Sequence, residues 1–405
     1  MTLPPKALPD VGWRHRAGLD RLCAVLGADA GRVRFVGGAV RDALLGIDVA
    51  DIDLATTHAP EQVIALLKGA GIKAIPTGLA HGTITAILPD GPIEVTTLRR
   101  DLETDGRHAT IAFTDDWRED AARRDFTMNA LYADPLGGQI FDYFGGLVDL
   151  QAGVVRFIGD PLQRIAEDHL RILRFFRFHA RFGDTIDTAG LAACTQRAND
   201  LMALSRERIA AETLRLLVAR HAVDVVALMV DEGIFTPVLP EIAAVPRFAR
   251  TAAREAANDM APSAIRRLVA LLPAAAVEDV GARLKLSNAD RKRMAVAAQP
   301  LLTDEPFALH YRLGAIGAAD QLLLSDLPDV TVAEKLAAIR DRQTPVLPLS
   351  GGQLVEAGVK KGPDVARLLR QVEERWIAEH FPDAARVAQL AEETVAGWRL
   401  SQRNL

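Results

Sequence analysis

The chain of 405 residues is 49% hydrophobic, 25% charged and 5% aromatic, and its formal net charge is −5. This composition describes a folded chain of roughly two to four domains. The acidic balance excludes a nucleic-acid binder that relies on a global basic field. The few aromatic residues argue against recognition by extensive base stacking.

The cysteine content and the lengths of the apolar runs indicate in which compartment the protein is expected. Cys23 and Cys194 are the only cysteines, which excludes a disulfide framework and a cysteine-rich zinc site and fits a reducing compartment. No apolar run approaches the ~18 residues that a membrane helix needs, and the N-terminus has no apolar signal core. We therefore expect a cytoplasmic protein without a membrane partner.

The N-terminal part is predicted to contain a helical segment over residues 1–30 and then, over 31–150, a domain in which strands and helices alternate. Gly, Pro and Asp separate the pieces. We predict a helix over Pro60–Lys68 and strands over Ile72–Ile75, Thr83–Leu88, Ile93–Leu98, Gln139–Phe144 and Val154–Ile158.

A glycine pair marks the first candidate site. Gly37 and Gly38 end the apolar run Val33–Val36, and the amphipathic segment Ala39–Leu45 follows at once. This pattern predicts a strand that turns into a helix N-terminus, where free backbone N–H groups and the helix dipole favour phosphate. A Gly-Gly pair on its own is usually only a turn.

Two carboxylates follow in an alternating segment. Asp51 and Asp53 flank Ile52, and residues two apart on a strand point to the same face. Their oxygens are ligands that suit Mg²⁺, although a lone Asp-x-Asp is more often a solvated strand edge. Glu94, in a neighbouring predicted strand, is either a third carboxylate of the same site or an ordinary exposed strand residue.

The segment Arg123–Tyr132 combines polar residues with an apolar helix predicted over Phe126–Tyr132. Arg124 and Asp125 offer a cation for phosphate and a carboxylate for ribose hydroxyls. An intramolecular ion pair between the two that caps the predicted helix is the alternative.

From Gly159 onward the sequence predicts almost continuous helix. One helix is expected from the N-cap Asp160 to Gly183, with Asp168, Arg171 and Arg174 on one face and Arg177 and Arg181 alongside. These residues form either a basic stripe that lines a cleft or a solvated face with salt bridges. An Asp acceptor beside an Arg donor matches the base edges of cytosine and adenine and disfavours guanine and uracil.

The remaining chain is predicted to be helical, beginning with a helix over Arg206–His221. The Pro- and Gly-rich segment Thr344–Gly362 looks like a hinge. We expect a helical neck at 151–225, a helical body at 226–343 and a helical tail at 344–405 that is a candidate tRNA contact.

In this order, the four blocks around Gly37, Asp51, Arg123 and Asp168 resemble class II tRNA nucleotidyltransferases, the CCA-adding enzymes of the poly(A) polymerase family. The resemblance implies an α+β fold: a small mixed-sheet, polymerase β-like nucleotidyltransferase head followed by an all-α neck, body and tail. It also implies site roles. The expected nucleotide-binding residues are Gly37, Gly38, Arg41, Arg124, Asp125, Asp168, Arg171, Arg174 and Arg177, and the expected catalytic residues are Asp51, Asp53 and Glu94.

The activity implied by this resemblance is addition or repair of the 3′-terminal CCA of tRNA from CTP and ATP. Two Mg²⁺ ions held by Asp51 and Asp53 would assist the transfer and the release of pyrophosphate. The implied partners are the tRNA 3′ end and the two nucleotides, and no protein partner is predicted.

Three rival functions follow from the same motifs. A bacterial poly(A) polymerase is disfavoured because Thr77–Thr85 is similar to the CCA-adding pattern. A partial CC- or A-adding enzyme is disfavoured because Arg99–Ala112, with Asp105–His108, is similar to the loop needed for the switch from C to A. The third rival, a non-catalytic tRNA-binding protein, conflicts with the intact carboxylates and Arg124.

Overall fold

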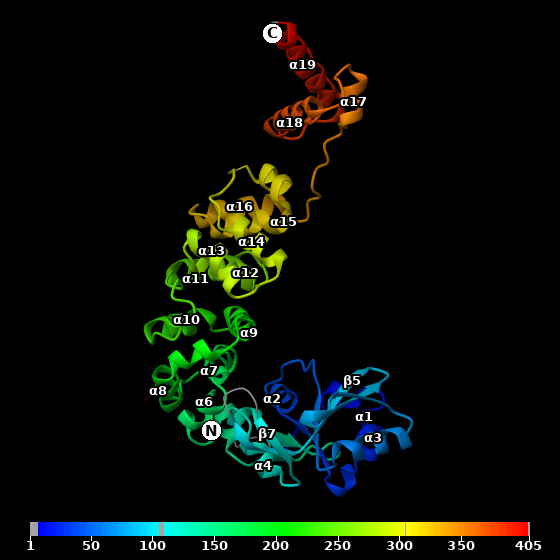
Figure 1. The fold of residues 1–405 in the computed structure, drawn as a ribbon, viewed down its shortest axis with the longest axis vertical. Coiled ribbons are helices and arrows are strands. Elements are labelled where there is room, and N and C mark those ends of the chain that lie inside the picture. Colours follow the sequence, from blue (N-terminus) through cyan, green and yellow to red (C-terminus); the bar gives the residue numbers. More distant parts are fainter. Residues whose placement is uncertain (1–6, 105–108, 304, 404–405) are drawn as a thin grey trace. The chain divides into compact units, whose positions relative to one another are not determined.

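A computed structural model describes residues 7–104, 109–303 and 305–403. The chain forms two compact units, the first comprising Met1–Val245 and Arg283–Leu286 and the second Pro246–Ala282 and Ser287–Leu405 (Figure 1). Asp105–His108, the centre of the predicted loop for C-to-A switching, lies outside the described residues.

A seven-stranded mixed sheet organises the first part of unit 1, with strand order β3-β4-β5-β2-β1-β8-β9. β2 and β5 run parallel, and the other neighbouring strands are antiparallel. The strands are β1 (Val33–Val36), β2 (Asp53–Thr56), β3 (Lys73–Gly78), β4 (Thr83–Leu88), β5 (Gly91–Thr97), β8 (Leu131–Ala133) and β9 (Ile140–Asp142). A separate hairpin joins β6 (Arg99–Thr104) and β7 (Ala109–Phe113).

The sheet core forms because apolar residues of adjacent strands alternate toward the same side. Phe35, Leu54, Ile84 and Val95 are all 2% exposed or less. Helices α1 (Leu19–Val25) and α3 (Pro60–Gly69) pack on each other, and α3 packs on β3 and β4 (Figure 1). Helix α2 (Gly38–Leu44) packs on β1 and β8, so the glycine pair is held at the end of a central strand.

Several sequence predictions for this part are confirmed. The structure has the predicted strands near residues 72–75, 83–88, 93–98 and 139–144 and the helix at Pro60. One detail differs. Strand β2 begins at Asp53, so Asp51 precedes the strand instead of lying within it. The mixed α+β class is confirmed as well.

The predicted strand over Val154–Ile158 is wrong. This segment makes only two isolated bridges, between Phe126 and Phe157 and between Val154 and Thr185. Phe157 is 2% exposed and stacks on Phe175 with ring centroids 5.5 Å apart. The apolar pattern therefore reflects burial in an aromatic cluster and not pairing in the sheet.

The predicted helix over Phe126–Tyr132 is also wrong. A short 3₁₀ helix, η4 (Thr127–Asn129), is followed directly by β8, in which Tyr132 pairs with Val36 of β1. Tyr132 is fully buried against the sheet. Tertiary pairing thus overrides the local helical pattern.

The helix expected between Asp160 and Gly183 is broken in two, α6 (Pro161–Glu167) and α7 (Leu170–Phe182). Asp160 caps α6 as predicted, because its carboxylate accepts from the N–H of Gln163 at 2.8 Å. Asp168 is extended, with φ −151° and ψ 105°. Its side chain accepts from the N–H of Leu170 at 3.1 Å, a local bond that competes with helix continuation.

Three further helices complete the main part of unit 1: α8 (Thr188–Gln196), α9 (Arg206–Leu217) and α10 (Ala222–Asp231). The helix predicted from Arg206 therefore ends before His221. α9 packs along α7, which brings residues about 40 positions apart in the sequence into contact, as in the bond between Arg208 and Asp168.

Unit 2 is helical throughout its regular structure. Its helices are α11 (Val245–Ala257), α12 (Ala264–Leu271), α13 (Val277–Arg283), α14 (Asn288–Ala297), α15 (Pro306–Leu324), α16 (Asp329–Ile339), α17 (Gly351–Glu356), α18 (Pro363–Ala378) and α19 (Ala384–Arg403). Buried ion pairs join Arg266 to Glu255 and Asp320, at 2.6 and 2.7 Å. The predicted hinge lacks helix and strand over residues 344–350, but α17 occupies its second half.

No helix among the described residues is both long and apolar enough to cross a membrane. The five-part division of the chain stays a prediction, because the contacts separate only two units.

Candidate active site

A cavity of about 640 Å³ in unit 1 collects nearly all of the predicted site residues. It lies where the glycine turn, the start of β2, the segment before η4, and α7 meet. Of the described residues, those that line it are Gly37, Gly38, Arg41, Asp51, Asp53, Arg123, Arg124, Asp125, Asn129, Asp168, Arg171, Arg174, Arg177 and Phe178. Of the predicted residues, only Glu94 is outside this set.

At the glycine turn, the backbone of Gly37 lies close to the side chain of Arg124. Gly37 has φ 66° and precedes the first turn of α2, a conformation that glycine adopts without strain. A Cβ at Gly37 would lie 3.4 Å from Nη1 of Arg124. Arg41, one turn into α2, is 5% exposed and has its guanidinium over the Phe182 ring at 4.3 Å.

Asp53 carries the strongest sign of crowded negative charge. It is the Cα partner of Glu94 in the parallel pair of β2 and β5. Burial raises the pKa of the Asp53 carboxyl, and the charges of Glu94 and Asp51 raise it further, while Arg124 lowers it. Accumulated carboxylate charge of this kind is what a bound divalent cation neutralises.

These carboxylates do not form a ready three-ligand cluster. In residues 7–104, 109–303 and 305–403, no group of three or more His, Cys, Asp or Glu side chains is arranged to hold a metal ion. Asp51 and Asp53 reach the cavity from just before and just inside β2, whereas Glu94 stands beside Asp53 in the sheet. Of these three carboxylates, Asp51 and Asp53 are therefore the ones available to a ligand in the cavity.

Arg124 is held by Asp120 and Tyr132. Its Nη2 donates to Asp120 at 3.1 Å and its Nε to the Tyr132 hydroxyl at 3.2 Å. Burial raises the pKa of the Asp120 carboxyl, but the guanidinium groups of Arg124 and Arg123 more than offset this and lower it well below its usual range. The alternative of a local Arg124–Asp125 ion pair is not observed, since Arg124 is oriented by the buried carboxylate of Asp120 in α4 (Trp117–Ala122).

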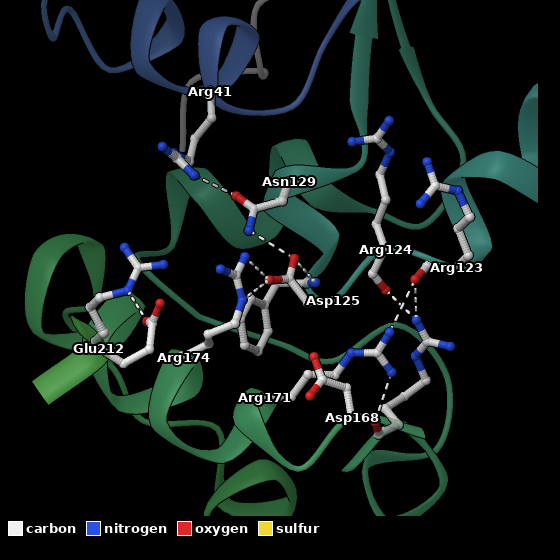
Figure 2. A network of polar contacts seen from close by, with 12 residues as sticks. Arg41, Arg123, Arg124, Asp125, Asn129, Asp168, Arg171, Arg174 and Glu212 are labelled. Carbon is white, nitrogen blue, oxygen red and sulfur yellow. Dashed lines mark hydrogen bonds and ion pairs between the residues drawn. The ribbon is translucent and has the colours of Figure 1, made fainter. Parts of the chain in front are cut away.

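Asp125 is the centre of a chain of polar contacts (Figure 2). Arg174 donates to Oδ2 through Nε at 2.8 Å and Nη2 at 2.5 Å. Oδ1 accepts from the N–H of Phe126 at 2.8 Å and from Nδ2 of Asn129 at 2.9 Å. Asn129 in turn accepts from Nη1 of Arg41 at 2.5 Å. The four donors fill the acceptor positions of this carboxylate.

Three arginines of α7, Arg171, Arg174 and Arg177, are paired with carboxylates and also line the cavity, whereas Arg181 lies outside its lining. Arg171 donates to Glu167 at 2.6 Å and to the carbonyl oxygen of Arg123 at 3.2 Å. Arg177 donates to the carboxylate of Glu212, a residue of α9, at 2.5 Å (Figure 2). The basic stripe was expected either to line a cleft or to form salt bridges on a solvated face. The structure has a part of each, because these arginines form salt bridges in the wall of a cavity.

The prediction that Asp168, Arg171 and Arg174 share one helical face is wrong in its geometry. Asp168 lies in the break between α6 and α7, and only the two arginines belong to α7. All three nevertheless line the same cavity. The helix break turns Asp168 toward it from a separate direction.

Sequence reasoning missed Arg123, Asn129 and Phe178 as cavity residues. Asn129 had a local signal, because it lies four residues after Asp125, within reach of a side-chain contact. Phe178 follows Arg174 by one helical turn, and the guanidinium of Arg174 is 5.2 Å from the centre of its ring.

Similarity to known proteins agrees with this geometry. Residues 33–156 match the family profile described as "Poly A polymerase head domain", and residues 185–245 match "Probable RNA and SrmB- binding site of polymerase A". The chain is 34% identical over 378 residues to the mitochondrial CCA tRNA nucleotidyltransferase 1 of Mus musculus, covering 89% of this chain and 86% of the relative. The chain belongs to the CCA tRNA nucleotidyltransferase family.

Other members of the family show the same relationship. The CCA-adding enzyme of Lacticaseibacillus paracasei is 31% identical over 359 residues, covering 86% of this chain and 89% of the relative. The solved structure of the Bacillus stearothermophilus CCA-adding enzyme in complex with CTP superposes with a TM-score of 0.71 at 25% identity, covering 96% of this chain and 99% of that one. The predicted family, the enzyme class and the α+β architecture are confirmed.

Proposed function

We propose that this protein adds or repairs the 3′-terminal CCA of tRNA from CTP and ATP without a nucleic-acid template. One observation carries the proposal. A single cavity joins the paired carboxylates Asp51 and Asp53 to the Asp168–Arg171 pair, so the chemistry that transfers a nucleotide and the groups that choose a base meet in one place. The relatives, named as a CCA tRNA nucleotidyltransferase and a CCA-adding enzyme and aligned over most of the chain, support it.

On the phosphate side of the cavity, Gly37 and Gly38 would offer backbone N–H groups, and Arg41 and Arg124 would offer guanidinium donors to the triphosphate. Arg124 is oriented for this by Asp120 and Tyr132. Arg41 is oriented by Asn129. Because these donors are fixed before the nucleotide arrives, little ordering is needed on binding.

Asp51 and Asp53 would hold Mg²⁺, with Glu94 beside Asp53 as the next carboxylate. The raised pKa of Asp53, which burial and the neighbouring carboxylates cause, fits this assignment. When bound, Mg²⁺ supplies acidification of the attacking tRNA 3′-hydroxyl and charge stabilisation of the departing pyrophosphate. Asp51 and Asp53 line the same cavity as Gly37 and Gly38, so the carboxylates that would hold the ion and the N–H groups that would hold the triphosphate share one space.

On the base side, the Asp168 carboxylate would accept from the exocyclic amino group of cytosine or adenine, and Arg171 would donate to a ring acceptor. Guanine and uracil present a carbonyl where these bases present the amino group, so they would face the carboxylate with an acceptor. Arg174 and Arg177 would support this wall, and Asp125 would serve the ribose if a sugar hydroxyl replaces one of its present donors.

The proposed location is the cytoplasm, with the tRNA 3′ end, CTP and ATP as partners. The two cysteines are both buried and free, which supports a reducing compartment. The mouse and human relatives are named as mitochondrial, so cell fractionation followed by immunoblotting tests the location.

The test of the activity is incubation with a tRNA that lacks its CCA end, with CTP, ATP or both, followed by sizing of the product. The proposal expects extension by two residues with CTP and by three with both nucleotides, since CCA contains two C and one A. A product that stops at CC with both nucleotides indicates a partial enzyme, a long A ladder indicates a poly(A) polymerase, and tRNA binding without extension indicates a non-catalytic protein. Each of these results contradicts the proposal.

A further inference from the structure

Asp168 is held from outside the cavity by one residue of α9. Nη2 of Arg208 donates to both carboxylate oxygens of Asp168, at 3.0 Å each. The two side chains are 32% and 31% exposed. Arg208 is not among the described residues that line the cavity, so it touches the carboxylate and not the space that a base would fill.

Because of where Asp168 lies, the contact with Arg208 helps to decide in which direction the carboxylate oxygens point. Asp168 lies in an extended break. Its backbone N–H donates to the carbonyl oxygen of Arg164 at 3.4 Å, and its own carbonyl oxygen accepts from the N–H of Arg171 at 3.0 Å, but these bonds do not fix the side-chain torsions. The terminal torsion of an aspartate side chain is broad, and the direction of its oxygens depends on their partners. The N–H of Leu170 holds Oδ1 at 3.1 Å, and Arg208 bridges the two oxygens, which sets the rotation of the carboxylate plane.

The same contacts determine how many further hydrogen bonds the Asp168 carboxylate can accept. A carboxylate has about four acceptor positions. Leu170 and Arg208 use two on Oδ1, and Arg208 uses one on Oδ2, so Oδ2 can accept one more donor. A single amino N–H from cytosine or adenine fits that capacity. Asp125 differs, because its four donors already fill it.

Each member of the base-reading pair thus has its own partner of opposite charge. Arg171 is oriented by Glu167 at 2.6 Å, from the end of α6. Asp168 is oriented by Arg208, from α9. One turn further along α9, Glu212 holds Arg177 at 2.5 Å, so α9 fixes two charged groups of the cavity wall through residues that follow each other at i, i+4.

We propose that Arg208 is a specificity-determining positioning residue, which aims the Asp168 carboxylate so that its remaining acceptor position meets the amino group of cytosine or adenine. This inference rests on the proposed function, because it requires that Asp168 reads the base. Without Arg208 only the N–H of Leu170 holds the carboxylate, so its rotation is less restricted and its preference for an amino group over a carbonyl weakens. Nucleotide choice then relaxes although every cavity residue is intact.

The experiment measures kcat and KM for single additions of CTP, UTP and GTP to tRNA lacking CCA, and of ATP, UTP and GTP to tRNA ending in CC. The full-length protein and its Arg208→Ala, Arg208→Lys and Arg206→Ala variants are compared. Arg206→Ala is the matched control, since it removes the same charge from the same helix two residues away. Thermal unfolding of each variant is recorded alongside.

We expect Arg208→Ala to lower the preference for C and A over U and G by roughly tenfold, the scale of one displaced base contact. Arg208→Lys should recover part of the preference because it restores a cation, and Arg206→Ala should match the unchanged protein. Because Arg208 acts through Asp168, the double variant Asp168→Ala/Arg208→Ala should show the same preference as Asp168→Ala alone.

An unchanged preference in a folded Arg208→Ala variant would overturn the inference, and so would additive effects in the double variant. If the alanine variant unfolds, Arg208→Gln keeps most of the side chain without its charge and supports or overturns the inference by the same ratio. Failure of the proposed function can be told apart from failure of the inference about Arg208. Failure of the unaltered protein to add C and A contradicts the proposed function, whereas normal CCA addition with an indifferent Arg208 contradicts only this inference.

Discussion

Arg174 of α7 places two guanidinium donors on one oxygen of Asp125, at 2.8 and 2.5 Å. Asp125 belongs to the segment that leads into η4 and β8, so this contact joins the sheet part of unit 1 to its first long helix. Burial raises the pKa of the Asp125 carboxyl, but the charge of Arg174 more than offsets this and lowers it overall. The pair is therefore ionised at neutral pH.

Removal of this pair should destabilise the protein. Arg174→Ala leaves a carboxylate that is 10% exposed without its cation, and we expect the free energy of unfolding to fall by about 2 kcal/mol or more. Arg181→Ala on the same helix is the control, since Arg181 is 44% exposed and its bond to Asp42 is long, at 3.4 Å. There the loss should be under about 1 kcal/mol. Urea unfolding of both variants decides the matter, and equal losses would contradict the prediction.

Asp120 should make stability depend on acid pH. Burial raises the pKa of its carboxyl, but Arg124 and Arg123 lower it well below its usual range. A carboxyl whose pKa is lower in the folded state adds stability above its unfolded pKa of about 3.9, and this stability is lost as pH falls through the folded value. We therefore expect the difference in unfolding free energy between the unaltered protein and Asp120→Asn to shrink below about pH 4. Asp29→Asn, at an exposed position, should track the unaltered protein at every pH.

Asp53 should show the opposite sign. Burial, Glu94 and Asp51 raise the pKa of its carboxyl, so the folded state binds the proton more tightly and the charged form destabilises it at neutral pH. Asp53→Asn should therefore be slightly more stable than the unaltered protein near pH 7 without added metal, and this advantage should vanish below the ordinary aspartate pKa. Saturating Mg²⁺ should raise the melting temperature of the unaltered protein and leave that of the variant unchanged. Calorimetry with and without Mg²⁺ tests both statements.

Asp53→Ala should abolish nucleotide incorporation while the fold and tRNA binding persist. The reason is that Asp53 is the carboxylate that lies at the start of β2 and lines the cavity, whereas the surrounding apolar packing does not depend on it. Primer extension measures activity, and a filter-binding assay with tRNA measures the interaction. Retained incorporation would remove Asp53 from the catalytic role.

Asp168→Ala and Arg171→Ala should relax the choice of C and A or lower turnover with both nucleotides, more than they weaken binding of the triphosphate. Both residues line the cavity and are held by separate partners. Steady-state kinetics with all four nucleotides separate turnover from KM. Exclusion of UTP and GTP at unaltered levels together with unchanged turnover would contradict their role in base reading.

The sequence predicted the parts of this site that depend on short spacing. Gly37, Gly38, Asp51 and Asp53 lie within one compact motif, and their convergence follows from a strand, a turn and a helix. The break at Asp168 was not predictable, because the flanking residues favour helix and only a side-chain bond to Leu170 interrupts it. A second local contact was present in the sequence but not predicted. Arg124 pairs with Asp120, four residues earlier, and not with adjacent Asp125, and this i, i+4 spacing is the one that brings side chains together on a helix.

Partners that are far apart in the chain could not be read from the pattern. Arg208 and Glu212 lie 40 and 35 residues from the groups they hold, and nothing in a single sequence links such positions. Val154–Ile158 shows the converse error. Its apolar and β-branched residues are typical of a strand, yet Phe157 is buried against Phe126 and Phe175 without a neighbouring strand.

The interruption at Asp168 also separates two mechanical attachments. Arg164 of α6 is fixed to the carbonyl oxygens of Arg123 and Arg124 at 2.6 and 2.5 Å, while α7 is fixed through Arg174 to Asp125. One continuous helix would place both attachments along a single axis. The extended residue Asp168 ends the axis of α6 before α7 begins, while Arg171 keeps the two helices joined through Glu167 and the carbonyl oxygen of Arg164. The joint therefore allows each helix to meet its own attachment at its own angle.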